Sequence, residues 1–211
     1  MSEIALTERA TPDRLTDVAA RPARQAAVVA AMAAVLPRHA ILSRHEDTVP
    51  YECDGLTACR ESPMVVVLPE TEAQVAAVLR VCQALQVPVV ARGAGTGLSG
   101  GALPHRMGVT LSLAKFNRIV EVDPVACTAT VQCGVRNLAI SEAAAPFGLY
   151  YAPDPSSQIA CTIGGNVAEN SGGVHCLKYG LTVHNVLRVR GFTAEGEPVE
   201  FGSEALDAAG L

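Results

Sequence analysis

The segment from Arg92 to Gly101 reads Arg-Gly-Ala-Gly-Thr-Gly-Leu-Ser-Gly-Gly and holds five glycines in its last nine residues. Glycine backbone approaches a ligand closely and takes positive φ without strain, and successive N–H groups of such a loop can cradle an anion. The hydroxyls of Thr96 and Ser99 add donors, while Arg92 supplies either a cation for the ligand or a structural contact. A turn that binds nothing is the alternative, but so much backbone freedom costs folding entropy. The segment therefore predicts a phosphate-binding loop.

The stretch from Gly95 to Gly100 also matches Gly-x-Gly-x-x-Gly, the fingerprint of dinucleotide-binding βαβ units. That motif requires a helix directly after it, whose N-terminus faces the pyrophosphate. Here the chain passes Pro104 and His105 and enters a β-branched stretch at 109–113. We therefore expect no Rossmann fold and no NAD site.

A second polar segment begins with Pro153 and Asp154 and continues to about residue 182. Between Thr162 and Gly173 it holds four glycines and two asparagines, and we expect residues 153–182 to be mostly loop. Its amides and hydroxyls suit the edge of a polar heterocycle and a ribityl chain, and its paired glycines let a flat ring lie against backbone. An unliganded loop of this length is uncommon in a compact domain.

The elements that must position these loops have an α/β pattern. A buried strand at 64–68 is followed by a helix that starts at the capping box of Thr71 and Gln74, and a strand at 87–91 follows. We also expect a helix over 22–36, a helix after Gly134 that ends at Gly148, and the strands 109–113, 118–122, 128–132, 186–192 and 198–201, in a mixed sheet.

Composition excludes several classes of protein. The 211 residues carry 16 basic and 21 acidic side chains, a net charge of −5, and only 4% aromatic residues, which argues against nucleic-acid binding. The longest apolar run, Val28 to Leu36, is too short for a membrane span, and the acidic N-terminus does not resemble a signal peptide, so we expect a cytoplasmic location. Seven cysteines without Cys-x-x-Cys spacing, and histidines without ligand spacing, predict reduced thiols and no metal site.

The sequence has five histidines, and their expected roles differ. We expect His39 and His45 to be exposed and His105 to lie at the surface. His175 and His184 flank the second glycine segment, where each has either a structural hydrogen-bonding role or an electrostatic effect on a bound ring.

Together the two glycine segments resemble the FAD-binding domain of the vanillyl-alcohol oxidase / p-cresol methylhydroxylase superfamily. The strand at 65–71 resembles that family's entry to the domain, Arg92–Gly101 its pyrophosphate loop, and Ile163–Gly173 with Lys178–Gly180 its flavin-ring region. Within the superfamily, residues 51–55 and 173–182 are most similar to the flavin subunits of bacterial glycolate oxidases. The resemblance covers about residues 35–211.

The resemblance implies an α+β fold of the p-cresol methylhydroxylase (PCMH) type, with a small α/β lobe and a larger mixed-sheet lobe. It divides the chain into a loosely ordered N-terminus at 1–21, a helical lead-in at 22–62 and the FAD-binding domain at 63–211. It also implies that FAD is held by Pro69, Arg92, Gly93, Ala94, Gly95, Thr96, Gly97, Leu98, Ser99, Pro153, Asp154, Thr162, Gly164, Gly165, Asn166, Asn170, Gly172, Tyr179 and Gly180.

Two departures from the family pattern have consequences. Members that bind flavin covalently often place a histidine where this chain has Thr96, so the resemblance implies noncovalent FAD. Family members continue into the end of the FAD domain and a substrate-binding cap, which carry the catalytic base and the substrate clamp. We expect that part to be missing here, so no residue of this chain is assigned a catalytic role, and we expect the chain alone to be inactive.

By resemblance, the parent enzyme oxidises a small 2-hydroxy acid to a 2-oxo acid by hydride transfer to FAD. The alternatives are a D-lactate or D-2-hydroxyglutarate dehydrogenase of the same superfamily and a noncatalytic flavin-binding module. The implied partners are other glycolate oxidase subunits, including an iron-sulfur subunit, through which the protein would lie peripherally at the inner membrane.

Overall fold

The structure is a computed structural model that describes residues 18–202. Its first lobe is built around a mixed sheet of four strands. Its spatial order is β1-β2-β4-β3; β2, β4 and β3 run parallel, and β1 pairs antiparallel with β2. Both β2 and β4 are buried along their whole length, as is typical of parallel strands. The strands are β1 (Ile41–Leu42), β2 (Val65–Val67), β3 (Val89–Arg92) and β4 (Val109–Ser112).

Helix α3 (Glu72–Leu85) carries the chain from β2 to β3, and its start confirms the capping box. Thr71 Oγ1 accepts a hydrogen bond from the Gln74 N–H at 3.2 Å, and Gln74 Oε1 accepts one from the Thr71 N–H at 3.3 Å. The helix ends at Gln86, which takes a left-handed conformation with φ of 51°. The predicted strand–helix–strand unit is thus present.

Helix α1 (Arg21–Met32) packs beside α3 and shares one core with the sheet. It is shorter than the predicted helix over 22–36, although Leu36 is still buried in that core. Because α1 and β1 pack against β2, residues 22–62 contribute to the same layer; the domain division at residue 63 stays a prediction. The expected disorder of residues 1–21 falls mostly on positions outside the described range. Shorter turns are η1 (Val18–Ala20), η2 (Arg38–Ala40), α2 (His45–Thr48) and η3 (Val49–Tyr51).

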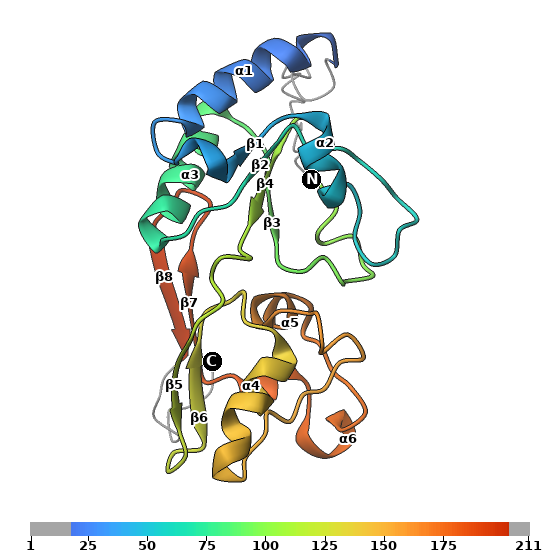
Figure 1. Cartoon of the computed structure of the whole chain (residues 1–211), viewed down its shortest axis with the longest axis vertical. Coiled ribbons are helices and arrows are strands. Elements are labelled where there is room, and N and C mark those ends of the chain that lie inside the picture. The colour runs from blue at the N-terminus through green and yellow to red at the C-terminus, as the bar shows by residue number, and fades with distance from the viewer. Residues whose placement is uncertain (1–17, 203–211) are drawn as a thin grey trace, which may run out of the picture.

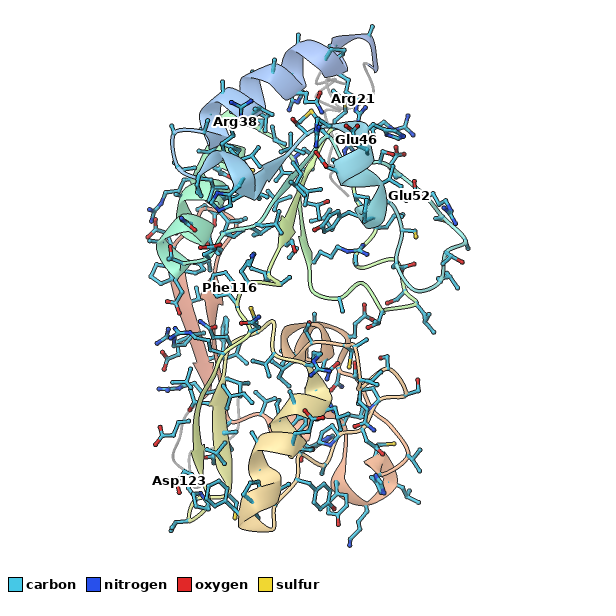
Figure 2. All side chains as sticks on the ribbon, viewed as in Figure 1. Arg21, Arg38, Glu46, Glu52, Phe116 and Asp123 are labelled. Carbon is cyan, nitrogen blue, oxygen red and sulfur yellow. The ribbon has the colours of Figure 1, made fainter. Side chains whose placement is uncertain are left out.

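A second lobe follows the sheet and has its own small core of Val135, Ile140 and Ile163. Figure 1 shows it beneath the sheet along the long axis, and Figure 2 shows Phe116 where the chain passes between the two lobes. Its elements are the antiparallel strands β5 (Ile119–Asp123) and β6 (Thr128–Val131), and the helices α4 (Asn137–Ala144), η4 (Ala145–Phe147), α5 (Ile163–Glu169), α6 (Cys176–Tyr179) and η5 (Thr182–Asn185).

A hairpin of β7 (Arg188–Phe192) and β8 (Pro198–Gly202) runs along one side of the molecule and reaches α3 (Figure 1). Arg190 pairs with Glu72 at 2.7 Å, and Arg80 pairs with Glu197 at 3.3 Å. The predicted hairpin is therefore confirmed, and it fastens the last described strands to the first lobe.

Two expectations need correction. The parallel strand pairs all lie in the first lobe, whereas the described strands of the second lobe pair only as antiparallel ribbons, so the mixed sheet belongs to the α/β lobe. The other correction concerns residues 153–182, which are mostly loop as expected but also contain two short helices, α5 and α6, that the sequence did not predict. At Gly164 an added Cβ would lie 2.8 Å from the Cys133 Cβ. This glycine therefore permits close packing of a helix rather than loop flexibility.

Among residues 18–202, no helix combines the length and apolarity needed to cross a bilayer.

Candidate functional site

The glycine loop leaves the sheet at the end of β3, and no helix interrupts residues 93–108. The rejection of a Rossmann motif is therefore confirmed. Within residues 18–202, the backbone N–H groups from Ala94 to Ser99 have no hydrogen-bond acceptor on the protein. Gly95 and Gly100 take positive φ values of 71° and 82°, which the glycines make possible. A run of unpaired donors on such backbone is the arrangement that binds anions.

Arg92 lies beneath this loop and is 8% exposed. Its Nη1 donates to the carbonyl oxygens of Cys53 at 2.8 Å and Ala102 at 3.3 Å, and its guanidinium lies 5.6 Å from the centre of the Tyr51 ring. Burial lowers the pKa of Arg92, while nearby Cys53, Tyr51 and Asp54 oppose that shift. The sequence left two roles open for Arg92, a structural contact or a cation for the ligand. The structure shows the structural contacts, and the positive charge of Arg92 lies close to the loop.

Asp54 forms one wall of the loop, a role that was not expected from the sequence. It is 6% exposed, and its Oδ2 accepts from the Gly100 N–H at 2.9 Å. The neighbouring Gly55 N–H donates to the Gly97 carbonyl at 3.0 Å, and an added Cβ at Gly55 would lie 2.7 Å from the Thr96 carbonyl. In the sequence, Asp54 and Gly55 appear only as part of the stretch 51–55 that resembles glycolate oxidase flavin subunits.

The second glycine segment meets the loop at Thr162. Thr162 is 7% exposed, and its Oγ1 is buried without a hydrogen-bond partner among the described residues. A Cβ added at Gly93 would lie 2.3 Å from that oxygen. Further along, Ser99 Oγ donates to Glu169 Oε2 at 2.5 Å. The structure thus brings together two predicted segments that are about 70 residues apart in the chain.

The corner at Pro153 is held by a buried pair of amides. Asn137 Nδ2 donates to the Pro153 carbonyl at 3.0 Å, and Asn166 Nδ2 donates to Asn137 Oδ1 at 2.8 Å. The two asparagines are 0% and 2% exposed. Asn166 was predicted to contact FAD, and its amide nitrogen is used inside the protein. Asn137 was missed, since nothing in the sequence distinguishes it from a helix-capping residue.

Asp154 accepts two hydrogen bonds from one residue, His175. Its Oδ1 accepts from the His175 N–H at 3.1 Å, and its Oδ2 lies 2.6 Å from His175 Nδ1. The backbone N–H of His175 is the main reason that the pKa of Asp154 is lowered. Gly173 permits this bend, because an added Cβ would lie 2.0 Å from the Asp154 carbonyl oxygen. The structural hydrogen-bonding role left open for His175 is therefore present.

An aromatic cluster lies beyond that bend. The rings of Tyr150 and Tyr179 meet edge to face with centroids 6.1 Å apart, and Lys178 Nζ lies 4.8 Å from the centre of the Tyr179 ring. The hydrogen bond with Tyr150, followed by the one with Lys178, lowers the pKa of Tyr179. Gly180 has a φ of 78° and adjoins His184, whose Nδ1 accepts from the Leu181 N–H at 3.1 Å.

The remaining predicted residues lie around the two segments. Buried Pro69 follows β2 at the same edge of the sheet as Arg92, whereas Leu98 is 66% exposed at the tip of the loop. Asn170 ends α5 in a left-handed conformation and accepts from the Val183 N–H, and Gly165 and Gly172 adjoin Thr162 and Leu181. No cluster of metal-ligating side chains occurs within the described range.

Comparison with known proteins gives one family and one fold. A family model described as "FAD binding domain" matches residues 63–202. Glycolate oxidase subunit GlcD of Escherichia coli K12 is 60% identical over 184 residues, which are 87% of this chain and 37% of that protein. The Bacillus subtilis subunit of the same name is 40% identical, over 76% of this chain and 34% of its own length. This chain therefore spans about a third of those relatives.

More distant similarities broaden the family. A D-lactate dehydrogenase of Archaeoglobus fulgidus is 38% identical over 67% of this chain and 32% of its own length. The crystal structure of p-cresol methylhydroxylase superposes with a TM-score of 0.73 at 24% identity, covering 84% of this chain and 35% of that one. At that identity the superposition shows the fold alone, and the fold is of the PCMH type.

Proposed function

This chain belongs to the FAD-binding-domain family, and from that premise we propose that it is the FAD-binding part of a flavoenzyme that oxidises a 2-hydroxy acid to a 2-oxo acid. The observation that carries the cofactor site is the meeting of the glycine loop with Thr162 and Glu169. The 60% identity to the E. coli glycolate oxidase subunit supports glycolate as the substrate.

The residues present fit the diphosphate of FAD. The N–H groups from Ala94 to Ser99 are unpaired within residues 18–202, and the buried Thr162 hydroxyl lacks a partner in the same range. A diphosphate would satisfy donors of both kinds, and buried Arg92 would supply nearby positive charge. The other glycine segment, with Gly165, Gly172 and Tyr179, would lie along the flavin.

This placement indicates what the cofactor and the protein would each contribute to the reaction. When bound, FAD supplies the hydride acceptor, and the protein supplies binding, orientation and electrostatics. Arg92 and Asp54 hold the loop in shape through buried hydrogen bonds, and Asn137 holds the Pro153 corner. We assign the catalytic base and the substrate clamp to none of the described residues.

FAD should be bound noncovalently, because Thr96 stands where covalent members of the superfamily often have a histidine. A threonine hydroxyl does not form the histidyl–flavin bond. Acid precipitation of the flavin-loaded chain should leave the yellow colour in the supernatant. Colour that stays with the precipitated polypeptide would contradict this part of the proposal.

The E. coli relative is named as a subunit, which supports assembly with further subunits. We propose that these include an iron-sulfur subunit that takes up electrons, and that the protein is cytoplasmic and peripheral at the inner membrane through those subunits. Co-purification of tagged protein with an iron-containing subunit would support this assembly, and purification of an isolated flavoprotein from its native cells would contradict it.

A chimera tests whether this chain can act as the FAD-binding part of a 2-hydroxy-acid oxidase when the relative supplies the rest of the enzyme. This chain replaces the matching 184 residues of the E. coli relative, and anaerobic bleaching of the flavin is followed with glycolate, D-lactate and D-2-hydroxyglutarate. We expect the chimera to be reduced fastest by glycolate, and the chain alone, loaded with FAD, to remain oxidised. FAD binding without reduction by any acid would favour a noncatalytic flavin-binding module.

A further inference from the structure

Glu169 lies at the C-terminal end of α5 and contacts the glycine loop of the first lobe. Its Oε2 accepts the hydrogen bond from Ser99 Oγ at 2.5 Å. Its Oε1 lies 3.0 Å from the positions that a Cβ would occupy at both Gly97 and Gly101. Three positions of the loop therefore converge on one carboxylate of the second lobe.

A carboxylate is unexpected beside a loop whose unpaired N–H groups suit an anion. A negative charge close to the loop weakens the binding of phosphate. Within residues 18–202, no basic side chain forms an ion pair with Glu169, and its one hydrogen-bond partner is Ser99. Holding a long side chain in one rotamer also costs entropy. The arrangement therefore needs a benefit that offsets both costs.

We propose that Ser99 and Glu169 form a latch that holds the glycine loop closed against α5 and so slows the escape of a bound diphosphate. Glu169 is a positioning residue: it acts through the loop, and Gly97 and Gly101 leave room for its carboxylate. The inference rests on the proposed function, since FAD is the diphosphate that the loop is expected to hold. It adds a residue outside the predicted site and gives a role to the contact between the lobes.

The test is a double-mutant cycle on the rate of FAD dissociation, followed by the return of flavin fluorescence after dilution. Ser99→Ala and Glu169→Ala should each release FAD about threefold to tenfold faster, because each removes the same charge-assisted hydrogen bond. The double variant should be no faster than either single variant. Glu169→Gln keeps an acceptor for Ser99 and should stay close to the wild-type rate. Ser141→Ala, which breaks a serine hydrogen bond to Tyr151 elsewhere in the second lobe, is the matched control.

The opposite pattern would overturn the latch. If Glu169 only repels the phosphates, both Glu169→Ala and Glu169→Gln will slow dissociation and Ser99→Ala will have no effect. Additive effects in the double variant would also contradict the proposal.

A second readout needs no cofactor. Hydrogen exchange of the backbone from Gly97 to Leu103, measured without FAD, should be faster in Ser99→Ala and Glu169→Ala and unchanged in Ser141→Ala. If wild-type protein binds no FAD, the proposed function fails while this exchange measurement still tests the latch. Equal exchange in all variants would overturn it.

Discussion

At the scale of single residues, the proposed binding site is distinguished by hydrogen-bond donors that the protein leaves unpaired. Buried polar groups normally have hydrogen-bond partners, so the orphaned Thr162 hydroxyl indicates a partner from outside the chain and costs stability until that partner binds. The N–H groups from Ala94 to Ser99 lie on exposed and half-buried residues and have no acceptor within residues 18–202, which leaves them free to bind an anion.

Thr162→Val should therefore change stability and affinity in opposite directions. Removing a buried, unpaired hydroxyl without changing the shape should raise the free energy of unfolding of the flavin-free protein by about 1 kcal/mol. The same change should weaken FAD binding about tenfold, since the hydroxyl is lost as a donor. Urea unfolding and FAD titration measure the two effects. A gain in stability with unchanged affinity would show that the hydroxyl does not contact the ligand.

Residue types in the sequence indicated the segments of the proposed site but not their supports. Glycine content indicated the loop, and the family resemblance indicated Thr162. The buried hydrogen bonds of Asp54, Asn137 and Glu169 join segments distant in the chain. Their partners are set by tertiary structure, so neither composition nor spacing reveals them.

At the scale of elements, local signals predicted well where they were strong. The capping box of α3, the buried strand β2 and the glycine that ends η4 all lie where the sequence places them. Helix α5 was not predicted from the sequence, because two consecutive glycines disfavour a helix by about 1 kcal/mol each. Burial of Ile163 and Asn166, and the close approach of Gly164 to Cys133, stabilise that helix through tertiary contacts instead.

The Asn137–Asn166 pair couples α4 to α5 and to the Pro153 corner. Asn137→Ala removes two buried hydrogen bonds and leaves the Asn166 amide and the Pro153 carbonyl unpaired, so unfolding free energy should fall by about 2–4 kcal/mol. FAD affinity should fall as well, because α5 carries the second half of the proposed site. Thr71→Ala, which removes the cap of α3 in the other lobe, should cost about 1 kcal/mol and leave affinity unchanged. Equal FAD affinity in Asn137→Ala and Thr71→Ala would show that the amide pair does not support FAD binding.

At the scale of the whole molecule, the first lobe supplies the glycine loop proposed to bind phosphate, and the second supplies the segment that faces it (Figure 1). The larger core lies in the first lobe and includes Val28 and Met32 of α1, Val78 and Cys82 of α3, and the interior of the sheet. The sequence predicted the α/β character of this lobe from its apolar strands. It did not predict which lobe holds the mixed sheet, because strand pairing over long separations leaves no local signal.

Cys82 reports on the integrity of that core. Burial raises its pKa to about 12 from 9.0, so almost none of it is thiolate at pH 8 and a thiol reagent should not modify it in the folded protein. Exposed Cys59 and Cys127 should react first. Since the folded-state pKa is raised, the stability contributed by this thiol is present below pH 9 and is lost as the pH rises toward 12. Mass spectrometry after labelling, with a guanidinium-unfolded control, checks the order; early labelling of Cys82 would mean an open core.

Titration of the purified chain with FAD, followed by flavin fluorescence, tests most directly whether the glycine loop holds the cofactor. Gly97→Val is the test variant, because the valine side chain would occupy space inside the loop. Its Cβ would meet only the carboxylate of Glu169, which can move. Gly191→Val on β7, where no atom lies within 4 Å of an added Cβ, is the control. We predict saturable binding of one FAD per chain in the wild type and the control, with loss of binding in a folded Gly97→Val. Absence of saturable binding by the folded wild-type chain, or equal binding by Gly97→Val, would contradict the site.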